Sequence, residues 1–355
     1  MTAYITRRQA LVGVGGLAGS VFGLGLQPSF AEETVRNRAL MPVSPVPDTE
    51  LRGLSLAGTD TVWISGRGGM VLRGVRGLGL RPHPVAGAEA LDFRDIHGHC
   101  PLRAVAMSAG PGEASTLWRT QTGGRTWDKV FVNPDADGFF NAIAFWTEQD
   151  GVVFGDPVGG RFALFRTQDG GQTWARHDPG IMPEVLPGEA AFAASGTCMA
   201  AGPEGRIAFV TGGDMSKSGG QARVFVSSPG GRDFRVVRVP VPADRPSRGL
   251  FSVTWADAST LIAVGGDYAD PAFEAVNAVI SRDGGLSFSA FDAGVRGYLS
   301  CVAEAKGQMM VTGLGGTAVN GQRLSDAPPM NSCALRPDGS GWLVGPKGRV
   351  LRLLP

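Results

Sequence analysis

Short apolar stretches alternate with glycine-containing turns along most of this chain. One pattern recurs, in which an apolar stretch ends in a glycine turn and a further apolar stretch follows. It is found at 62–67, 104–110, 152–156, 208–214, 262–267, 310–313 and 343–345. Short apolar runs bounded by glycine are typical of β-strands, and no convincing amphipathic helix interrupts them. The pattern therefore predicts an all-β protein built from seven similar units.

A second motif follows the first in four of these units. It reads Thr-Gln-Thr-Gly-Gly-Arg-Thr-Trp at 120–127, Thr-Gln-Asp-Gly-Gly-Gln-Thr-Trp at 167–174, Ser-Ser-Pro-Gly-Gly-Arg-Asp-Phe at 227–234 and Ser-Arg-Asp-Gly-Gly-Leu-Ser-Phe at 281–288. These copies match the Asp-box pattern, S/T-x-D-G-G-x-S/T-aromatic. Asp169 and Asp283 keep the aspartate, whereas Thr122 and Pro229 replace it.

The physical chemistry of this motif suits a hairpin turn. The carboxylate can accept amide hydrogens of its own loop, the glycines can take positive φ, and the aromatic ring can pack under the sheet. We interpret the motif as a fold element and not as a catalytic or metal site. Its expected structural residues are Asp169, Asp283, Trp127, Trp174, Phe234 and Phe288.

Seven units over roughly 310 residues give ~44 residues per unit, the length of a four-stranded propeller blade. We predict a seven-bladed β-propeller of four-stranded antiparallel blades with degenerate Asp-box hairpins. A β-sandwich, or a ring of six or eight blades, is the alternative, because the sixth and seventh units are short. A solenoid is disfavoured, because the terminal units of a solenoid are polar caps, whereas the terminal units of this chain resemble the interior ones.

The chain divides into three segments. Residues 1–31 are expected to be an export signal, because Arg7-Arg8 precede an apolar run at 11–26 and an A-x-A-like site ends at Ala31. A twin-arginine signal is favoured over general secretion, which predicts a periplasmic protein cleaved near Ala31. Residues 32–50 are a candidate ring-closing strand, and 51–355 form the single propeller domain. No run is apolar enough to predict a transmembrane segment.

Composition changes this picture little. The 355 residues include 54 glycines, 18% are charged and the net charge is +1, which gives no reason to expect nucleic acid. The four cysteines of the mature part (Cys100, Cys198, Cys301 and Cys333) are too widely spaced for a C-x-x-C motif. We expect these cysteines to be small buried apolar residues. Cys301 and Cys333 are the first pair to check for a disulfide. A monomer is expected.

Longer stretches of the chain resemble one known family. They are 91–96, 110–115, 139–146, 155–162, 187–197 and 264–268. In these stretches the chain resembles the bacterial relatives of the photosystem II stability and assembly factor, whose Asp-box (BNR-like) propellers are shared with sialidases. The resemblance implies an exported propeller that binds a partner, which in the photosynthetic relatives is an assembling membrane protein. No dinucleotide, C-x-x-C or haem motif is found, so no cofactor is predicted.

A binding site is expected at the turns that end the repeated apolar strands. Read in order, these turns carry one charged residue in six of the seven units, and flanking segments add four polar residues. The candidate binding residues are Arg67, Glu113, Asp156, Asp214, Asp267 and Lys347, with Glu189, Ser195, Tyr268 and Asn277 beside them. The hypothesis is an acidic arc facing a basic edge, which would attract a cation, an amine or a basic peptide. In the alternative, these acids cap their own turns.

Two other functions leave weaker signals. Asp95-x-His97-x-His99 places three potential metal ligands on one strand face, but a solvated strand end explains them as well, and no metal is predicted. A sialidase-like glycosidase needs an arginine triad and a tyrosine nucleophile; only Tyr268 and Tyr298 follow the signal. The preferred function is a non-catalytic binding or assembly module for an exported or membrane protein or a small polar ligand. The alternative is a glycosidase or glycan-binding propeller.

Overall fold

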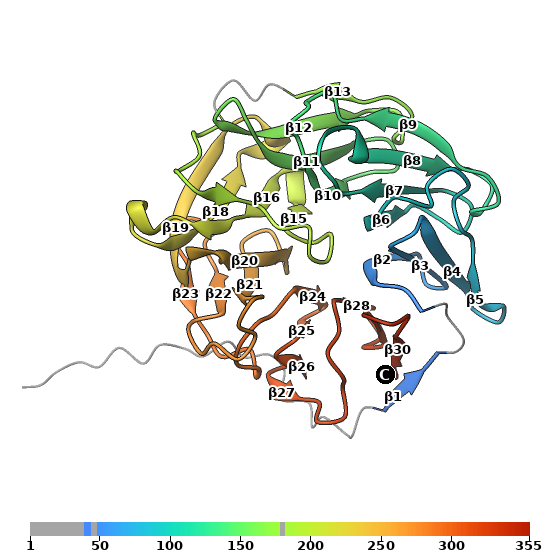
Figure 1. Cartoon of the computed structure of the whole chain (residues 1–355). Coiled ribbons are helices and arrows are strands. Elements are labelled where there is room, and N and C mark those ends of the chain that lie inside the picture. Colours follow the sequence, from blue (N-terminus) through green and yellow to red (C-terminus); the bar gives the residue numbers. More distant parts are fainter. Residues whose placement is uncertain (1–38, 44–47, 178–181) are drawn as a thin grey trace, which may run out of the picture.

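The computed structural model describes residues 39–43, 48–177 and 182–355. In these ranges the chain forms seven antiparallel sheets, six of four strands and one of six, arranged around a common centre (Figure 1). The predicted export signal at 1–31 lies outside the described residues. No helix of the described ranges is long and apolar enough to cross a membrane.

We number the sheets in chain order, starting from the one that contains residue 51. Sheet 1 is β2 (Leu51–Ala57), β3 (Thr61–Gly66), β4 (Met70–Val75) and β5 (Gly79–Pro82). Sheet 2 is β6 (Phe93–Gly98), β7 (Ala104–Ser108), β8 (Thr116–Thr120) and β9 (Asp128–Val132). Sheet 3 is β10 (Phe140–Phe145), β11 (Gly151–Val158), β12 (Arg161–Thr167) and β13 (Ala175–Arg176).

Sheet 4 is β15 (Met199–Ala201), β16 (Ile207–Val210), β18 (Gln221–Ser227) and β19 (Phe234–Pro242). Sheet 5 is β14 (Glu189–Ala190), β17 (Gly212–Asp214), β20 (Asp244–Trp255), β21 (Leu261–Asp267), β22 (Ala278–Ser281) and β23 (Ser289–Ala290). Sheet 6 is β24 (Cys301–Ala305), β25 (Gln308–Gly313), β26 (Gly316–Val319) and β27 (Gln322–Arg323).

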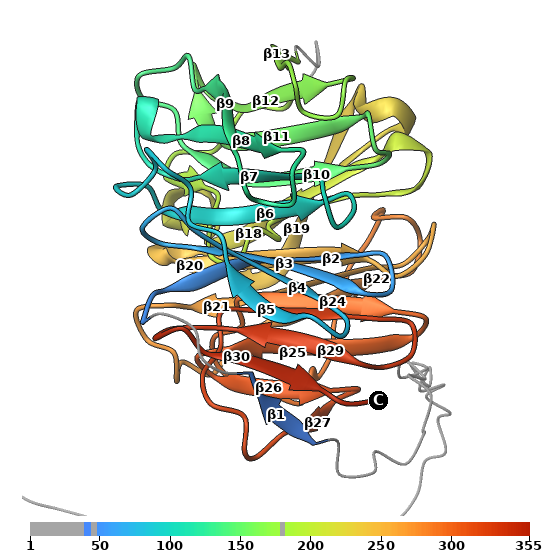
Figure 2. The ribbon, with the colours of Figure 1, turned by 90° about the vertical axis from the view of Figure 1, so that its right-hand side faces the viewer.

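Sheet 7 combines strands from distant parts of the chain. It is β28 (Ser332–Leu335), β29 (Gly341–Val344), β30 (Val350–Leu353) and, paired with β30, β1 (Leu40–Pro42). Figure 2 shows β1 beside β30. Four short 3-10 turns complete the described elements: η1 (Gly112–Ala114), η2 (Pro203–Gly205), η3 (Ser216–Ser218) and η4 (Pro229–Gly231).

The repeated apolar stretches of the sequence are the second strands of these sheets. Every residue of β3, β7 and β21 is buried, because both faces of each strand pack against neighbouring sheets. This explains why they read as continuous apolar runs and not as alternating ones. The outermost strands β13, β23 and β27 are instead exposed. The prediction of seven β units from the sequence is therefore confirmed.

The first strands of successive sheets lie around the centre. Each of β2, β6, β10, β15, β20, β24 and β28 contacts the next, and β28 contacts β2. The largest apolar cluster fills the space between sheets 3, 4 and 5, where the rings of Phe154, Phe209 and Phe225 stack with centroids 4.4 Å apart in each adjacent pair. Because the core lies between sheets, each sheet depends on its neighbours for burial.

Sheet 5 is widened on one side by β14 and β17. Gly212 pairs with Gly249, and a Cβ at Gly212 would lie 2.4 Å from the carbonyl oxygen of Arg248. Only glycine permits so close an approach of two backbones. This extra pairing fixes the start of the segment 191–198, which then enters the centre of the molecule.

Candidate functional site

A cavity of about 510 Å³ lies at the centre, at the end where the first strands begin. Residues from all seven sheets, or from segments next to them, line it. They are Glu50, Arg52, Arg94, Phe139, Asn141, Asp156, Ala191, Phe192, Ala193, Ala194, Phe251, Tyr268, Tyr298, Leu314, Asn331 and Pro346. A cavity of this size suits a small molecule or a few residues of a peptide.

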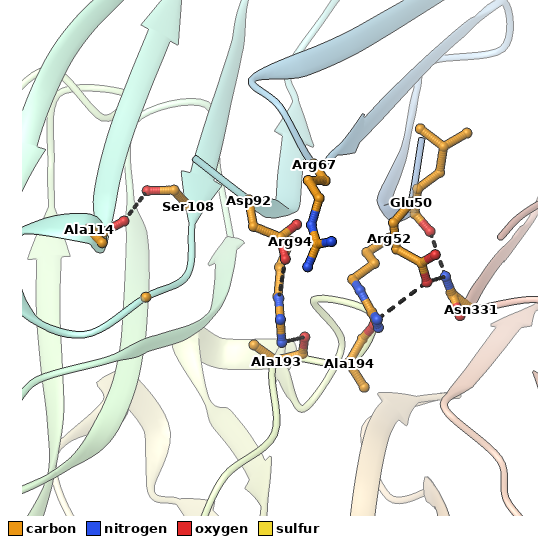
Figure 3. Close-up of polar contacts among 12 residues, drawn as sticks. Glu50, Arg52, Arg67, Asp92, Arg94, Ser108, Ala114, Ala193, Ala194 and Asn331 are labelled. Atoms are coloured by element: carbon orange, nitrogen blue, oxygen red, sulfur yellow. Dashed lines mark hydrogen bonds and ion pairs between the residues drawn. The ribbon is translucent and has the colours of Figure 1, made fainter. Parts of the chain in front are cut away.

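The segment 191–197 forms the floor of this cavity. Arg52 donates from Nη1 to the carbonyl oxygen of Ala194 (2.9 Å), and Arg94 donates from Nη1 to that of Ala193 (3.3 Å; Figure 3). Ser195 donates from Oγ to the carbonyl oxygen of Ser300 in front of sheet 6 (2.7 Å). The segment thus joins sheets 1, 2 and 6 across the centre.

Gly196 allows the floor to pass close to sheet 2. Its φ is +75°, and a Cβ there would lie 2.3 Å from the carboxyl carbon of Asp95. That carboxylate accepts hydrogen bonds from the amides of Ile96 and Ile143, both at 2.7 Å. Burial raises the pKa of Asp95 well above its usual range. Asp95 therefore supports the floor from below and belongs to the structure of the centre.

Two arginines are held at the edge of the cavity by carboxylates. Arg52 pairs with Glu50 (3.3 Å) and Arg94 with Asp92 (2.9 Å). Burial first, and then the nearby positive charge of Arg94, lower the pKa of Arg52. The paired acid and a floor carbonyl oxygen hold each guanidinium group in place. Each guanidinium group still has N–H donors that could bind a ligand.

Two neighbours complete this edge. Asn331, in front of sheet 7, donates from Nδ2 to Glu50 Oε1 (2.8 Å) and to the carbonyl oxygen of Leu51 (2.9 Å). Arg67 lies in the turn after β3, and in Figure 3 its guanidinium group appears between those of Arg52 and Arg94. Within the described ranges, the Arg67 side chain forms no hydrogen bond or ion pair. Sheets 1, 2 and 7 thus build a cationic edge, in which the Arg67 guanidinium group has no partner among the described residues.

The wall formed by sheets 4, 5 and 6 is aromatic. The rings of Phe192 and Phe251 stack with centroids 4.2 Å apart, and Tyr298 meets Phe251 edge-on at 4.9 Å. Tyr268 meets both phenylalanines at wider spacing and is 48% exposed. This wall offers flat apolar surface to the non-polar part of a ligand.

The structure places two of the predicted binding residues, Asp156 and Tyr268, on the cavity. Arg67 lies in the cationic edge described above, and Ser195 is buried in the floor. Lys347 is exposed in the turn after β29, where Gly348 donates to the carbonyl oxygen of Thr49, so the Arg67 and Lys347 turns lie beside the same segment.

Two predicted acids are ion-paired inside the protein. Glu189 accepts hydrogen bonds from Arg223 Nε (2.8 Å) and from the Thr211 hydroxyl (2.6 Å). Asp267 is paired with Arg248 Nε at 2.8 Å. The carboxylates of both pairs are almost fully buried. Their charges are therefore neutralised within the structure.

The remaining predicted residues lie away from the cavity lining. Asp214 accepts hydrogen bonds from the hydroxyl (2.6 Å) and amide (3.3 Å) of Ser216, as a turn-capping acid does. Asn277 donates from Nδ2 to the carbonyl oxygens of Val295 (2.9 Å) and Gly297 (2.7 Å). Glu113 is exposed in η1. The turn-cap alternative thus describes the geometry of Asp214.

The hairpin motifs lie at the opposite end of the sheets. Thr167, which starts one motif, pairs with Gly151 at the far end of β11 from Asp156. Both glycines of each motif have positive φ, from 69° to 85°. Trp127 packs edge-on against Trp63 of sheet 1 at 6.2 Å, Trp174 lies near Phe145, and Phe234 lies near Phe209. Phe288 packs against the largest cluster.

The two histidines at the end of β6, His97 and His99, pack with a phenylalanine. The rings of His97 and His99 lie 4.9 Å apart, and each contacts Phe145. Burial lowers the pKa of His97 to about 3 and that of His99 to about 4, so both are neutral at pH 7. No cluster of three or more metal-ligating side chains is found in the described ranges. All four cysteines of those ranges are unpaired thiols; Cys301 donates to the carbonyl oxygen of Cys333 (3.5 Å).

The main cationic residues of the cavity are absent from the binding residues predicted from sequence. The prediction considers the turns between second and third strands, whereas Arg52 and Arg94 stand at the start of first strands. One signal could have found them. Glu-Leu-Arg-Gly at 50–53 and Asp-Phe-Arg-Asp at 92–95 share an acid two residues before an arginine, so the two units repeat the same ion pair.

Comparisons with known proteins bear on the fold. No family model matches this chain, and no curated protein sequence matches it. The solved structure of YCF48 from Cyanidioschyzon merolae is similar over 89% of this chain and 99% of that one, with a TM-score of 0.63 and 13% identity. The WD40 β-propeller domain of Doa1 is similar over 89% and 96%, with a TM-score of 0.55 and 11% identity. The chain therefore has the fold of a β-propeller.

Proposed function

We propose that this protein is an exported, periplasmic, non-catalytic binding or assembly module that receives its partner at the central cavity. The proposal includes a closed seven-bladed propeller with degenerate Asp-box hairpins, similar to photosystem II assembly-factor-like proteins. The partner is an exported or membrane protein, or a small polar ligand. One observation carries the proposal: Arg52 and Arg94 are fixed at the edge of a floored cavity that is lined by residues from the sheets or from segments next to them.

This arrangement suits recognition of an anionic group. A guanidinium group has five N–H donors, and the floor and the paired acid together engage one donor on each of two nitrogens of Arg52. Planar guanidinium groups bind carboxylates and phosphates in a bidentate manner. Because both side chains are already held in place, little conformational freedom is lost when an anion binds. Arg67 adds an unpaired positive charge at the entrance.

The geometry favours binding over glycoside hydrolysis. Tyr298 lines the cavity together with the arginines, and burial raises its pKa. A tyrosine nucleophile needs the opposite shift, since the phenolate attacks. The aromatic wall does favour one second candidate, a glycan-binding propeller, in which an acidic sugar would place its carboxylate at the arginines and its ring on Phe192 or Tyr268.

Affinity capture from periplasmic and membrane extracts of the host tests the proposal. Residues 32–355 serve as bait beside the double variant Arg52→Gln/Arg94→Gln, and captured proteins are identified by mass spectrometry. Arg232→Gln/Arg235→Gln is the matched control, because both of its arginines are exposed near the hairpin end of sheet 4. Circular dichroism checks that each variant is folded.

A protein that wild type and control retain and the cavity variant loses is the expected result. Equal capture by all three baits contradicts the proposal. If wild type captures an acidic glycan that the cavity variant does not, and the captured proteins are the same for both, the glycan-binding candidate is supported instead.

A further inference from the structure

The side of the cavity formed by sheet 3 differs chemically from the cationic edge. There β11 has an irregularity between Gly155 and Pro157, which turns Asp156 toward the cavity. Asp156 Oδ1 accepts hydrogen bonds from Asn141 Nδ2 (2.9 Å) and from the amide of Ala191 (3.2 Å). In the part of the chain that the structure describes, its other oxygen, Oδ2, accepts none, and no cation pairs with the carboxylate.

A neighbouring polar atom also lacks a partner. Asn141 lines the same cavity, is completely buried, and its Oδ1 is a buried acceptor without a hydrogen bond in the described ranges. Buried acceptors are normally satisfied, and a carboxylate that is even partly buried without a counter-ion is costly; Asp156 is half-buried. Burial first, opposed by the Asn141 hydrogen bond, raises the pKa of Asp156. Within the described ranges, sheet 3 therefore presents two hydrogen-bond acceptors, Asp156 Oδ2 and Asn141 Oδ1, that have no partner.

The other charged residues around the cavity do not neutralise Asp156. Arg94 is bonded to Asp92 and to the floor, and Arg52 to Glu50 and to the floor. The cavity thus has donors on the side of sheets 1 and 2 and acceptors on the side of sheet 3. Phe192 of the floor and the partly exposed Phe139 supply apolar surface.

The geometry points to an amphoteric ligand that carries a carboxylate and a protonated amine joined by an apolar stretch. The carboxylate is bound by Arg52 and Arg94, the ammonium group donates to Asp156 and Asn141, and the connecting methylene groups lie on the aromatic rings. This inference rests on the proposed function and adds the chemical class of the ligand. The same chemistry is present in a free amino acid with a distant amine and in a peptide that ends in a carboxylate near a lysine.

Calorimetric titration with matched pairs of ligands tests this inference. The amine-bearing series is 4-aminobutanoate, 6-aminohexanoate and 8-aminooctanoate; the amine-free series is butanoate, hexanoate and octanoate. A short peptide ending in Lys-Ala, compared with its lysine-acetylated form, distinguishes a peptide source from a small molecule. The proteins are wild type, Asp156→Asn, Arg94→Gln and, as a matched control, Asp233→Asn, which alters an exposed acid.

We expect wild type and Asp233→Asn to bind the best amine-bearing ligand about tenfold or more tightly than its amine-free partner, because a charge-assisted hydrogen bond forms in a partly dry site. Asp156→Asn should reduce that preference to within about twofold, because the carboxylate that accepts from the ammonium group is lost. Arg94→Gln should weaken both series alike. Equal affinity of wild type for both members of each pair, or no binding of any ligand, overturns the inference.

A second measurement covers the case in which Asp156→Asn does not fold. Wild type is titrated with 3-aminopropanesulfonate and propanesulfonate, whose sulfonates stay ionised, at falling pH. The preference for the amine should disappear as the pH falls through the raised pKa of Asp156; a preference that persists to pH 3 contradicts the inference. The capture experiment, which depends on Arg52 and Arg94, decides the proposed function independently.

Discussion

Aspartates at the two ends of the sheets are bonded in opposite ways. At the hairpin end, Asp169 Oδ1 accepts from the amides of Gln172 and Thr173 (both 2.9 Å), and Oδ2 accepts from the Thr173 hydroxyl (2.6 Å). Partial burial opposes these bonds, which nevertheless lower the pKa of Asp169 to about 2. At the cavity end, Asp156 has one uncommitted oxygen and a raised pKa. Both oxygens of the hairpin carboxylate accept hydrogen bonds from its own loop, whereas among the described residues only one oxygen of the cavity carboxylate accepts any.

This difference shows how to separate structural from functional acids in a repeat protein. Asp283 repeats the bonding of Asp169, with its own hydroxyl and amide donors, and the Ser287 hydroxyl bond first among them lowers its pKa. A motif that repeats with both carboxylate oxygens hydrogen-bonded within its own loop stabilises the fold. An acid with an oxygen that faces a cavity and has no partner among the described residues is available to a ligand.

The largest expected effect concerns an acid at the cavity end that is nevertheless structural. Glu189→Ala should lower the free energy of unfolding by about 3–5 kcal/mol, because Arg223 would stay buried without its counter-ion. Guanidinium chloride unfolding measures this loss. Glu113→Ala, at an exposed acid, is the control and should change it by less than about 0.5 kcal/mol. Equal stability of the two variants would break the distinction between buried pairs and free acids.

A smaller loss is expected at the hairpin end. Asp169→Ala removes the acceptor of several loop hydrogen bonds and should cost about 1–3 kcal/mol. Asp169→Thr should cost less, since Thr122 at the equivalent place accepts from the amide of Thr126 (2.9 Å). Because the folded pKa is lowered, this stability is complete above the unfolded pKa of ~4 and is lost as the pH falls toward 2. Urea unfolding between pH 5 and pH 2 tests it, and a pH-independent difference would contradict it.

The buried histidines predict a separate pH dependence. The folded pKa of His97 is about 3, so the unfolded chain binds its proton first as the pH falls below ~6.5. Stability present at pH 7 should therefore decrease by roughly 1–2 kcal/mol toward pH 5 on account of this residue. His97→Phe, which keeps a ring against Phe145, should flatten that slope. Parallel profiles for variant and wild type would show that His97 is not the titrating group.

The smallest effect on stability is expected at the unpaired arginine. Arg67→Gln should change the free energy of unfolding by less than about 0.5 kcal/mol, because its side chain is exposed. The affinity for octanoate should fall a few-fold and become less sensitive to salt. Calorimetry at two ionic strengths measures both effects. A loss of stability without any change in affinity would place Arg67 with the structural residues.

The sequence predicts the sheets well because second strands are buried on both faces and read as unbroken apolar runs. The hairpins can also be predicted from the sequence, because their turns need positive φ and therefore contain glycine pairs. It predicts the cavity poorly because the cavity depends on long-range contacts. The bonds of Arg52 and Arg94 to Ala194 and Ala193 span 142 and 99 residues, and nothing local to those alanines marks them as acceptors.

The rim residues show the same limit. Asp156 and Asp267 follow similar apolar strands and glycines, so local pattern treats them alike. The difference comes from Arg248, which pairs with Asp267, whereas no arginine pairs with Asp156 in the described ranges. Charge patterns along a chain therefore indicate where acids gather, but the partner of each acid is decided by tertiary structure.

Sheet 7 has a consequence for the order in which the protein matures. Its outer strand, β1, comes from residues 40–42 and pairs with β30 at 351–353, so this sheet cannot be completed until the last strand has left the ribosome. Pairing across so long a sequence separation is slow. The cationic edge likewise joins distant parts of the chain, because Asn331 next to sheet 7 donates a hydrogen bond to Glu50 beside Arg52. Ligand binding at the centre is then expected only after these two distant parts of the chain have come together.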